Sequence, residues 1–307
     1  MNHDDTPAPA TVATCSERLG NAAFDTPADV HGAEHAYRTA RQNCLRLGFI
    51  EVDAECLARA WQAQTVRTGH FDDQAWPEAP EDFGMSPLPP ARRADAFAPC
   101  PERLGLYAVL PDAAWVGRMA RAGVPTVQLR FKSDDAAAIA AETRAAVAAV
   151  QDTDALLFIN DHWQAAIDAG AYGVHLGQED LDALAPEHLQ RIRSAGLRLG
   201  VSTHGYAEMV RADAVSPSYI AMGAVFPTTL KKMATAPQGL ARLGAYARLL
   251  RGQSLVAIGG IDAERLPDVL GTGVGSVAMV RALIAADDPE ATAAELTAAV
   301  AAGASLH

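Results

Sequence analysis

The chain has 307 residues, of which half are hydrophobic and 20% are charged, so it can bury a large core and still carry an appendage. Its formal net charge of -12 argues against a nucleic-acid or anionic-membrane binder, although a local cluster of donors could still hold a small phosphorylated substrate. No uncharged run reaches the roughly 18–20 apolar residues that span a bilayer, and the first residues lack a secretory signal, so we expect a soluble, cytoplasmic protein.

The first hundred residues differ in composition from the remainder. A helical region is expected at about residues 31–67, and residues 69–101 are rich in proline. Proline lacks the backbone donor that a continuous helix needs, so the second stretch predicts an extended linker. We therefore expect residues 1–100 to form a partly helical N-terminal extension and residues 101–307 to form the main domain.

Beyond this point, short apolar runs typical of strands alternate with Ala-rich segments typical of amphipathic helices. The expected strands are residues 104–110, 126–132, 155–161, 173–178, 198–203, 219–226, 254–260 and 276–283. Helix candidates include residues 113–122, 135–150, 186–195, 236–250 and 262–270. Strands without polar alternation are buried on both faces, and the strand-then-helix order implies parallel pairing. The pattern predicts an α/β protein, a (β/α)8 TIM barrel with an N-terminal helical and irregular extension. An open doubly wound sheet is the competing fold, but no GxGxxG follows the first strand.

Polar residues stand repeatedly where the expected strands end. They include Arg130 and Lys132, Asn160 and Asp161, Gln178 and Asp180, Ser202 and Thr203, and Thr228, Thr229 and Lys231. Chemistry in a TIM barrel collects at the C-terminal ends of its strands. We therefore expect these residues to form the functional site.

The second expected strand ends on a cationic pattern. Gln128, Arg130 and Lys132 alternate along it, so they share one side, in the barrel lumen or at its mouth. Two cations at a barrel mouth are costly in free energy unless an anion meets them. The pattern indicates an anion site, and a strand end held by salt bridges is the alternative.

Two carboxylates, Asp161 and Asp180, follow neighbouring strands. Adjacent strands lie roughly 5 Å apart, so the two side chains could share one Mg²⁺, which leaves room for phosphate oxygens and water. The alternative is that each aspartate only caps a helix. Facing Arg130 and Lys132, the pair is better explained as a metal site for a diphosphate.

A second anion site is expected across the rim. Residues 226–232 supply hydroxyls, backbone amides and a cation, and Gly259 and Gly260 let the backbone approach a ligand closely. With the amides of Val280 and Arg281, they match the phosphate site between the last two barrel loops. A solvated loop and an ordinary glycine turn are the alternatives. Two phosphorylated ligands held in facing anion sites suggest a transferase or a ligase-like coupling.

Seven segments occur in the order found in one enzyme family. They are residues 128–132 (QLRFK), 159–161 (IND), 173–181 (GVHLGQEDL), 200–204 (GVSTH), 226–231 (FPTTLK), 236–240 (APQGL) and 257–261 (AIGGI). On these motifs the chain resembles thiamine phosphate synthase (thiamine-phosphate pyrophosphorylase) from Leu104 to about Ala302.

The resemblance implies a role for each site residue. The pyrimidine diphosphate would be held by Gln128, Leu129, Arg130, Phe131, Lys132, Asn160, Ser202 and Lys231. Asp161 and Asp180 would bind Mg²⁺. The thiazole phosphate would be held by Thr228, Thr229, Leu230, Gly260, Val280 and Arg281. Arg130, Lys132 and Lys231 would act in catalysis by stabilising the departing pyrophosphate.

Two positions depart from the family pattern. Leu230 stands where the family usually carries a second hydroxyl residue, so Thr229 or backbone amides would have to supply that donor. Arg281 replaces a residue that is often small, and we expect its backbone amide to make the contact.

The implied reaction condenses 4-amino-2-methyl-5-(diphosphooxymethyl)pyrimidine with 4-methyl-5-(2-phosphooxyethyl)thiazole to give thiamine phosphate and pyrophosphate. Positioning and charge stabilisation would carry it by a dissociative, Mg-assisted substitution. The alternatives are a thiazole tautomerase-like enzyme, which would not need both the cations and the carboxylates, and a non-catalytic sensor of thiamine precursors. The oligomeric state is left open, a homo-oligomer included.

The extension carries no functional motif. It faintly suggests the tail of a pyrimidine-phosphate kinase, but it is too short for that fold and shows no phosphate-binding glycine loop. We expect it to pack against the barrel or a neighbouring subunit.

Overall fold

The structure is a computed structural model that describes residues 32–86, 93–228 and 235–304. The chain divides into two compact units. One comprises the described residues of Met1–Ala94, together with Thr203–Ser216 and Gly244–Gly252. The other comprises those of Asp95–Ser202, Pro217–Leu243 and Gln253–His307.

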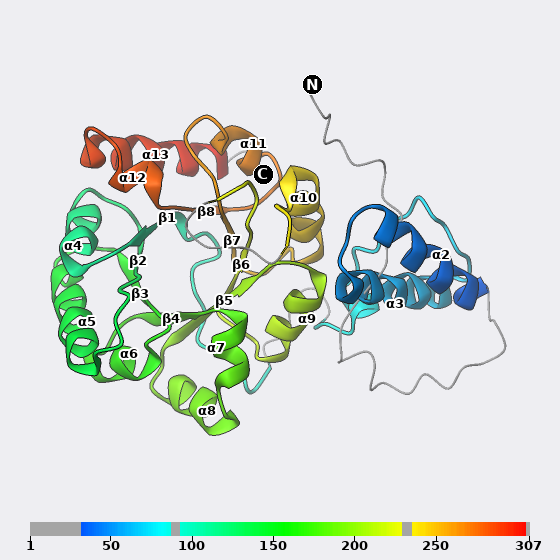
Figure 1. The fold of residues 1–307 in the computed structure, drawn as a ribbon, viewed down its shortest axis with the longest axis horizontal. Helices are drawn as coiled ribbons and strands as arrows, with labels where there is room; N and C mark the ends of the chain where they lie inside the picture. Colours follow the sequence, from blue (N-terminus) through cyan, green and yellow to red (C-terminus); the bar gives the residue numbers. More distant parts are fainter. Residues whose placement is uncertain (1–31, 87–92, 229–234, 305–307) are drawn as a thin grey trace. The chain divides into compact units, whose positions relative to one another are not determined.

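Eight parallel strands close into a barrel in the order of the sequence (Figure 1). The strands are β1 (Gly105–Leu110), β2 (Thr126–Leu129), β3 (Leu156–Asn160), β4 (Gly173–Leu176), β5 (Arg198–Thr203), β6 (Tyr219–Met222), β7 (Leu255–Ile258) and β8 (Ser276–Met279). Closure is made by β1 pairing with β8, where Tyr107 is in register with Ala278. The predicted (β/α)8 barrel is therefore confirmed.

Helices connect and follow the strands. They are α4 (Ala113–Arg121), α5 (Ala136–Val150), α6 (Trp163–Ala169), α7 (Gln178–Ala183), α8 (Pro186–Ser194), α9 (Tyr206–Ala214), α10 (Gly239–Leu249), α11 (Leu266–Leu270), α12 (Arg281–Ile284) and α13 (Pro289–Ala304). Seven of the eight strands are shorter than the sequence predicts, whereas β5 spans the predicted residues 198–203. β2, for example, ends at Leu129, so the residues up to Lys132 lie beyond it, among the segments that form the rim.

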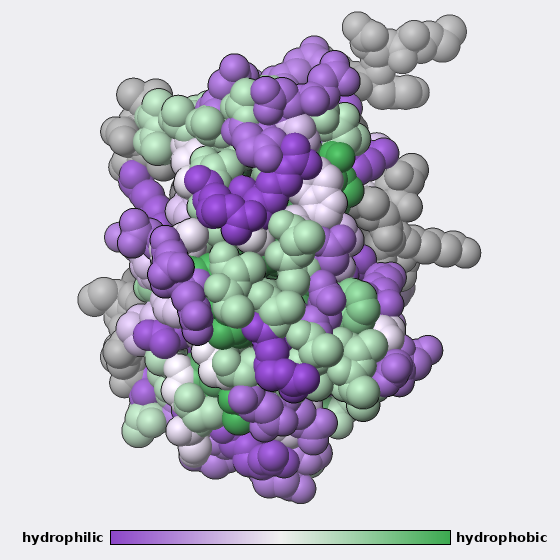
Figure 2. All heavy atoms as spheres, turned by 90° about the vertical axis from the view of Figure 1, so that its left-hand side faces the viewer, coloured by the Kyte–Doolittle hydropathy of each residue, from purple (hydrophilic) through white to green (hydrophobic). Residues whose placement is uncertain are grey.

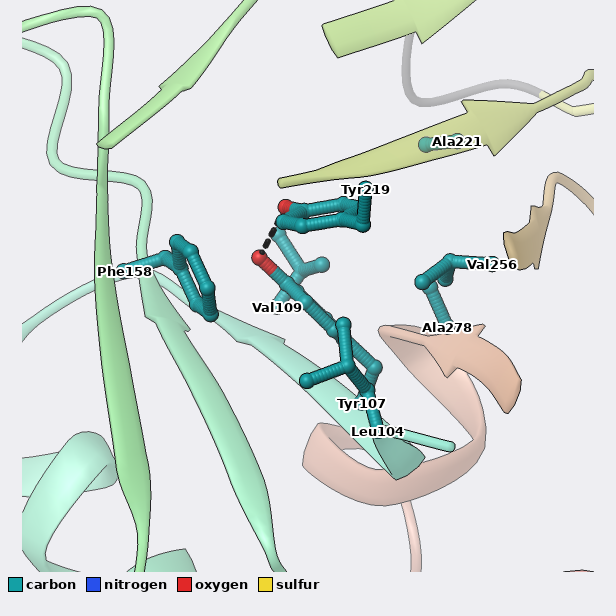
Figure 3. Packing of buried hydrophobic residues seen from close by; sticks show 8 residues of the cluster. All are labelled: Leu104, Tyr107, Val109, Phe158, Tyr219, Ala221, Val256 and Ala278. Atoms are coloured by element: carbon teal, nitrogen blue, oxygen red, sulfur yellow. Dashed lines mark hydrogen bonds between the residues drawn. The ribbon is translucent and has the colours of Figure 1, made fainter. Parts of the chain in front are cut away.

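The barrel lumen is filled by side chains (Figure 3). Its cluster of buried residues comprises Leu104, Tyr107, Val109, Phe158, Tyr219, Ala221, Val256 and Ala278. The ring of Tyr219 fits because residue 200 is glycine; a Cβ there would overlap the Cζ atom of Tyr219. The lumen is thus a packed core, as expected for a small barrel.

Among the described residues of the unit that contains the N-terminal part of the chain, helices α2 (Ala33–Arg46) and α3 (Glu51–Thr68) pack on each other. The single helical region expected at residues 31–67 is interrupted at Gly48, whose φ of 77° is in the left-handed range. The buried carboxylate of Asp53 accepts a hydrogen bond from the backbone N–H of Ala207 at 2.9 Å. Asp53 thereby supplies α9 with an acceptor for one of its unpaired first-turn amides.

The proline-rich stretch after α3 is packed within residues 69–86, whereas the sequence predicts an extended linker; Pro87, Pro89 and Pro90 lie outside the described residues. It contains a short 3-10 helix, η2 (Pro80–Phe83), which begins with proline at the position that needs no backbone donor. Phe83 is fully buried and stacks on Tyr206 with ring centroids 5.5 Å apart. The Trp76 indole donates a hydrogen bond to the Tyr206 hydroxyl at 3.0 Å. These aromatic side chains hold residues 76–83 in place.

The side of the barrel that carries α5 mixes hydrophilic residues with small apolar ones (Figures 1 and 2). Exposed positions of α5 include Ala136, Ala137, Ala141 and Ala145, which favour the helix while each exposes little apolar area. Within the described residues, no helix combines the length and the apolar character that crossing a membrane requires.

Candidate active site

The predicted pyrimidine-binding residues that are polar and described lie at the C-terminal ends of β2, β3 and β5. Gln128 is buried near the end of β2, and Asn160 is the last residue of β3. The Gln128 amide nitrogen donates a hydrogen bond to Asn160 Oδ1 at 2.9 Å. Ser202 is the penultimate residue of β5.

A chain of buried hydrogen bonds joins Ser202 to Gln128 through the lumen. His175, on β4, contacts Ser202 Oγ through Nε2 at 2.8 Å and Tyr219 Oη through Nδ1 at 2.7 Å. The Tyr219 and Tyr107 hydroxyls lie 2.7 Å apart (Figure 3). Tyr107 in turn donates to Gln128 Oε1 at 2.8 Å. None of His175, Tyr107 and Tyr219 was predicted from the sequence to belong to the site.

Strand alternation is a signal that could have identified His175, but not the two tyrosines. In β4, Val174 and Leu176 flank His175, so the imidazole points to the opposite side of the strand from both apolar neighbours. Tyr107 and Tyr219 stand in apolar runs, where a tyrosine resembles any core aromatic residue. Their pairing depends on the register of β1 and β6, which lie far apart in sequence.

The two predicted metal ligands come together on the same rim. Partial desolvation and the nearby Asp180 carboxylate, which is within hydrogen-bonding reach, raise the pKa of Asp161 to about 6. His162 and Arg130 act in the opposite direction, so Arg130 lies close enough to influence this carboxyl group. The side chain of Asp161 is otherwise exposed, which leaves its carboxylate accessible to a ligand.

The backbone at Asp161 is unusual. Its φ of 64° lies in the left-handed region, which non-glycine residues seldom adopt. Its N–H donates to the backbone carbonyl of His175 at 2.9 Å, which anchors the turn to β4. Strained backbone of this kind is found at functional sites when neighbouring structure holds it in place.

The alternative explanation, that each aspartate only caps a helix, holds for Asp180 but not for Asp161. One Asp180 oxygen accepts from the backbone N–H of Gly177 at 3.2 Å, at the start of α7. Helix α6, by contrast, begins after Asp161 with His162 as its N-cap residue and has no side-chain cap. The carboxylate of Asp161 is therefore not explained by capping.

The other predicted residues near the end of β2 differ in burial and contacts. Lys132 is exposed, and the backbone carbonyl of Phe131 is 3.1 Å from His162 Nε2. Leu129 is buried as the last residue of β2. Gln178 donates from its amide nitrogen to the Ser202 carbonyl at 2.7 Å. Its Oε1 atom is buried and has no hydrogen-bond partner within the described residues.

The predicted thiazole-phosphate site is only partly described. Thr229, Leu230 and Lys231 lie outside the described residues, and Thr228 is the last residue before that gap. Val280 precedes α12, and Arg281 is its first residue, with an exposed side chain.

The glycines after β7 have a packing role that was not predicted from the sequence. A Cβ on Gly259 would lie 2.5 Å from the Cβ of Ala224, and one on Gly260 would lie 2.6 Å from the carbonyl oxygen of Pro227. The backbone N–H groups that follow Ala224 also donate hydrogen bonds to the end of β7, from Val225 to Ile258 and from the next residue to Gly259, both at 3.0 Å. The glycines therefore allow the loop after β6 to pack closely on the end of β7.

The donor set of the rim suits a small hard cation better than zinc. Within the described part of the chain, no group of three or more His, Cys, Asp or Glu side chains could enclose a metal ion. Two carboxylates alone are a poor zinc site. Mg²⁺ is commonly bound by one or two carboxylates, with water and substrate phosphates completing its shell.

Comparison with known proteins identifies the barrel. The family model for thiamine monophosphate synthase matches residues 106–283. A thiamine-phosphate synthase of Neisseria meningitidis is 54% identical over 195 residues, which are 64% of this chain and 94% of that protein. One of Cronobacter sakazakii is 55% identical over 192 residues, covering 62% of this chain and 90% of that protein.

A solved structure agrees with the sequence relatives. The thiamine phosphate pyrophosphorylase from Pyrococcus furiosus superposes with a TM-score of 0.58 at 26% identity, covering 65% of this chain and 96% of that one. The family match extends over more than half of the chain and includes every rim position discussed above. The chain belongs to the thiamine monophosphate synthase family.

Proposed function

We propose that the barrel couples 4-amino-2-methyl-5-(diphosphooxymethyl)pyrimidine to 4-methyl-5-(2-phosphooxyethyl)thiazole, giving thiamine phosphate and pyrophosphate. The observation that carries this proposal is the meeting of Asp161, Asp180 and Arg130 at one end of the barrel. A carboxylate whose pKa is raised by burial and by a neighbouring carboxylate, beside a guanidinium, is suited to a cation and a diphosphate together. The curated relatives of the barrel are named thiamine-phosphate synthases.

The metal of this proposal is Mg²⁺, and the residues fit it. Asp161 and Asp180 would hold the ion, because their charges repel one another unless a proton or a cation lies between them. When bound, Mg²⁺ would neutralise charge on the diphosphate. The raised pKa of Asp161 supports a site built to receive positive charge.

The protein's own part in the reaction is binding and charge stabilisation. The bond between the pyrimidine methylene carbon and the diphosphate oxygen breaks, and its electron pair leaves with pyrophosphate. Arg130, Lys132 and Lys231 stabilise the negative charge that develops on that leaving group. The thiazole nitrogen then donates its lone pair to the methylene carbon. No enzyme nucleophile takes part.

Two sets of residues hold the reactants at the correct distance. Gln128, Asn160 and Ser202 contact the pyrimidine, and the main chain at Leu129 and Phe131 lies beside its diphosphate. The thiazole phosphate is assigned to Thr228, Thr229, Leu230, Gly260, Val280 and Arg281. Holding both reactants in line supplies much of the rate enhancement, since such positioning lowers the entropic barrier.

The N-terminal residues are assigned a supporting role within a cytoplasmic enzyme. Helices α2 and α3 belong to the same compact unit as α9 and the end of α10, and Asp53 bonds to the first turn of α9. A segment that helps to hold helices following β5 and β6 has a structural task that requires no kinase activity.

Pyrophosphate release tests the function. The full chain is supplied with both substrates and Mg²⁺, and we expect pyrophosphate and thiamine phosphate in equal amounts. Asp161→Ala and Arg130→Ala should each lower turnover by about 100-fold or more. Asp152→Ala is the matched control, because Asp152 is exposed in the turn before β3, at the opposite end of that strand.

Other outcomes would contradict the proposal. Isomerisation of a thiazole without pyrophosphate release would indicate a tautomerase-like enzyme. Binding of either precursor without turnover would indicate a sensor. Normal turnover by Asp161→Ala would remove the carboxylate pair from the mechanism.

A further inference from the structure

We propose that the buried hydrogen-bond chain through the lumen sets the hydrogen-bonding polarity of the pyrimidine site, so that Asn160 presents a donor and Ser202 presents an acceptor. Tyr107, His175 and Tyr219 are then positioning residues that select a 4-aminopyrimidine over a 4-oxopyrimidine. The inference rests on the proposed function, because it concerns how that site recognises its pyrimidine.

The chain of bonds is continuous and shielded from water. Its central residues are only 2% exposed at Tyr107, 0% at Tyr219 and 7% at His175. All its donor–acceptor distances lie between 2.7 and 2.9 Å. Its two ends, Asn160 and Ser202, are half-buried and therefore keep an accessible edge.

The direction of each bond follows from the Gln128 amide. Its nitrogen donates to Asn160, and its oxygen accepts the single hydroxyl proton of Tyr107. Because that proton is used, the Tyr219 hydroxyl must be the donor in its bond with Tyr107. The oxygen of Tyr219 must then accept a proton from His175 Nδ1.

The proton positions at the Ser202 end of the chain follow in the same way. A neutral imidazole carries one ring proton, so His175 with a protonated Nδ1 has a bare Nε2. That nitrogen accepts the hydroxyl proton of Ser202. Ser202 has no proton left for a ligand and offers only oxygen lone pairs. Asn160 Oδ1 is occupied by Gln128, which leaves the N–H groups of Asn160 for a ligand.

Burial keeps the protons of this chain in place. Desolvation raises the pKa of Tyr107 far above its usual value, and desolvation together with neighbouring Tyr107 does the same for Tyr219. Both phenols therefore remain donors over the whole working pH range. Reversing the polarity would require both side-chain amides to turn over and every proton between them to move. If only part of the hydrogen-bond chain were reversed, two donors or two acceptors would face each other where the two directions meet.

Packing holds the central tyrosine rigidly in this chain. The Tyr219 ring is stacked on the His175 ring with centroids 5.7 Å apart. It also makes an edge-to-face contact with the Phe158 ring, with centroids 5.1 Å apart; Figure 3 shows Tyr219 and Phe158. Gly200 leaves space for the ring. Phenylalanine at position 219 would retain these contacts and remove only the hydroxyl.

The polarity of the ends matches one class of pyrimidine. A 4-aminopyrimidine carries a ring nitrogen that accepts beside an exocyclic amino group that donates. A 4-oxopyrimidine carries a ring N–H that donates beside a carbonyl that accepts. The 4-aminopyrimidine therefore complements the donor of Asn160 and the acceptor of Ser202. The 4-oxopyrimidine would place a donor against a donor and an acceptor against an acceptor. Sites with fixed polar groups reject such reversed ligands strongly, so we expect at least about 100-fold weaker binding of the oxo analogue.

The histidine tautomer gives a direct test without any ligand. Long-range ¹H–¹⁵N correlation spectra of the full chain, labelled at histidine, distinguish protonated Nδ1 from protonated Nε2; His175→Gln assigns the signal. We expect a neutral His175 protonated at Nδ1. Protonation at Nε2, alone or together with Nδ1, would overturn the inference.

Selectivity gives the second test. Binding of the 4-amino and 4-oxo pyrimidine diphosphates is measured with Mg²⁺ for the native chain and for Tyr219→Phe. We expect the preference of the variant for the amino compound to be about tenfold smaller than that of the native chain, since the two hydrogen bonds that link Tyr219 to Tyr107 and His175 are lost. Retention of the full preference would overturn the inference.

A matched control separates polarity from packing. Tyr206→Phe removes the hydroxyl of another fully buried tyrosine, one that accepts a hydrogen bond from Trp76. It should leave the ratio of the two affinities unchanged. A loss of preference as large as that of Tyr219→Phe would show that any buried hydroxyl matters equally, and would contradict the inference.

The two proposals can fail separately. If the native chain releases no pyrophosphate from the 4-amino substrate and the thiazole phosphate, the proposed function fails whatever the tautomer of His175. If turnover is normal and His175 is protonated at Nε2, only the polarity inference fails.

Discussion

Each of the two compact units buries tyrosines, and the difference lies in what their hydroxyls contact. In the unit with the N-terminal residues, the Tyr206 hydroxyl accepts the indole N–H of Trp76, which belongs to the same aromatic cluster. In the barrel, the hydroxyls of Tyr107 and Tyr219 bond to each other and onward to His175. One set of tyrosines holds a structure together, whereas the other also determines which atoms of the rim carry protons.

The largest effect should come from removing the ring of Tyr206. Tyr206→Ala deletes a fully buried aromatic side chain and should lower the free energy of unfolding by about 3–5 kcal/mol. Tyr206→Phe should cost about 1 kcal/mol, because the ring remains. Urea denaturation of both variants measures the difference. Equal losses would mean that the hydroxyl, rather than the ring, anchors this cluster.

A methyl group beside Tyr219 should lower the free energy of unfolding less than Tyr206→Ala does, but it should lower the activity more. Gly200→Ala places a Cβ against the Tyr219 ring, and such overpacking should cost about 2 kcal/mol. Pyrophosphate release should fall at least about tenfold as the ring moves out of the hydrogen-bond chain. Gly196→Ala is the control, since a Cβ there meets no atom within 4 Å although its φ of 75° adds strain. Similar activity in both variants would argue against a role for the position of Tyr219.

A smaller effect is expected at Asp53. Asp53→Asn keeps the shape of the side chain but removes the charge that faces the first turn of α9, which should cost about 1 kcal/mol. Thermal unfolding compares it with Asp73→Asn, an exposed position in the same unit. An unchanged melting temperature in Asp53→Asn would show that the charge contributes nothing to α9.

The smallest effect concerns the carboxylate pair and depends on pH. A folded pKa of about 6 for Asp161, above its usual 3.8, favours the folded state at low pH. Without metal, that contribution should disappear as the pH rises through about 6. Asp161→Asn should flatten this part of the stability–pH curve, and Mg²⁺ should restore stability to the native chain above pH 6. A native curve that is already flat there would contradict the coupling of the two carboxylates.

Much of the fold could be read from the sequence because the barrel repeats one unit. Each apolar run is followed by an amphipathic helix, and this order alone predicts parallel strands and the rim to which Asn160 and Asp161 belong. Strand ends were harder to place, since a run such as residues 126–132 stays apolar or alternating after its ladder has ended at Leu129. The strand propensity of a residue contains no information about where the neighbouring strand ends.

The residues missed at the site were those whose role depends on partners from distant strands. Asp161 is recognisable in the sequence as a charged residue at the end of an apolar run, whereas the position of Tyr219 predicts an ordinary core residue. The connection of Tyr219 to Tyr107 and His175 requires the register of a closed barrel, which local patterns do not contain. The glycines after β7 were recognised, but their fit depends on the loop after β6, which lies one whole helix earlier in the chain.

The bond between Asp53 and the first turn of α9 has a consequence for anyone who shortens or recombines this enzyme. Cutting the chain at the start of β1 would follow the family match, but it would remove the acceptor that serves Ala207 and the rings that cover Tyr206. The truncated chain would then present an apolar, unsatisfied helix face to solvent, which favours aggregation. Grafting this barrel onto another scaffold would therefore need a replacement cover for α9, or polar substitutions on it.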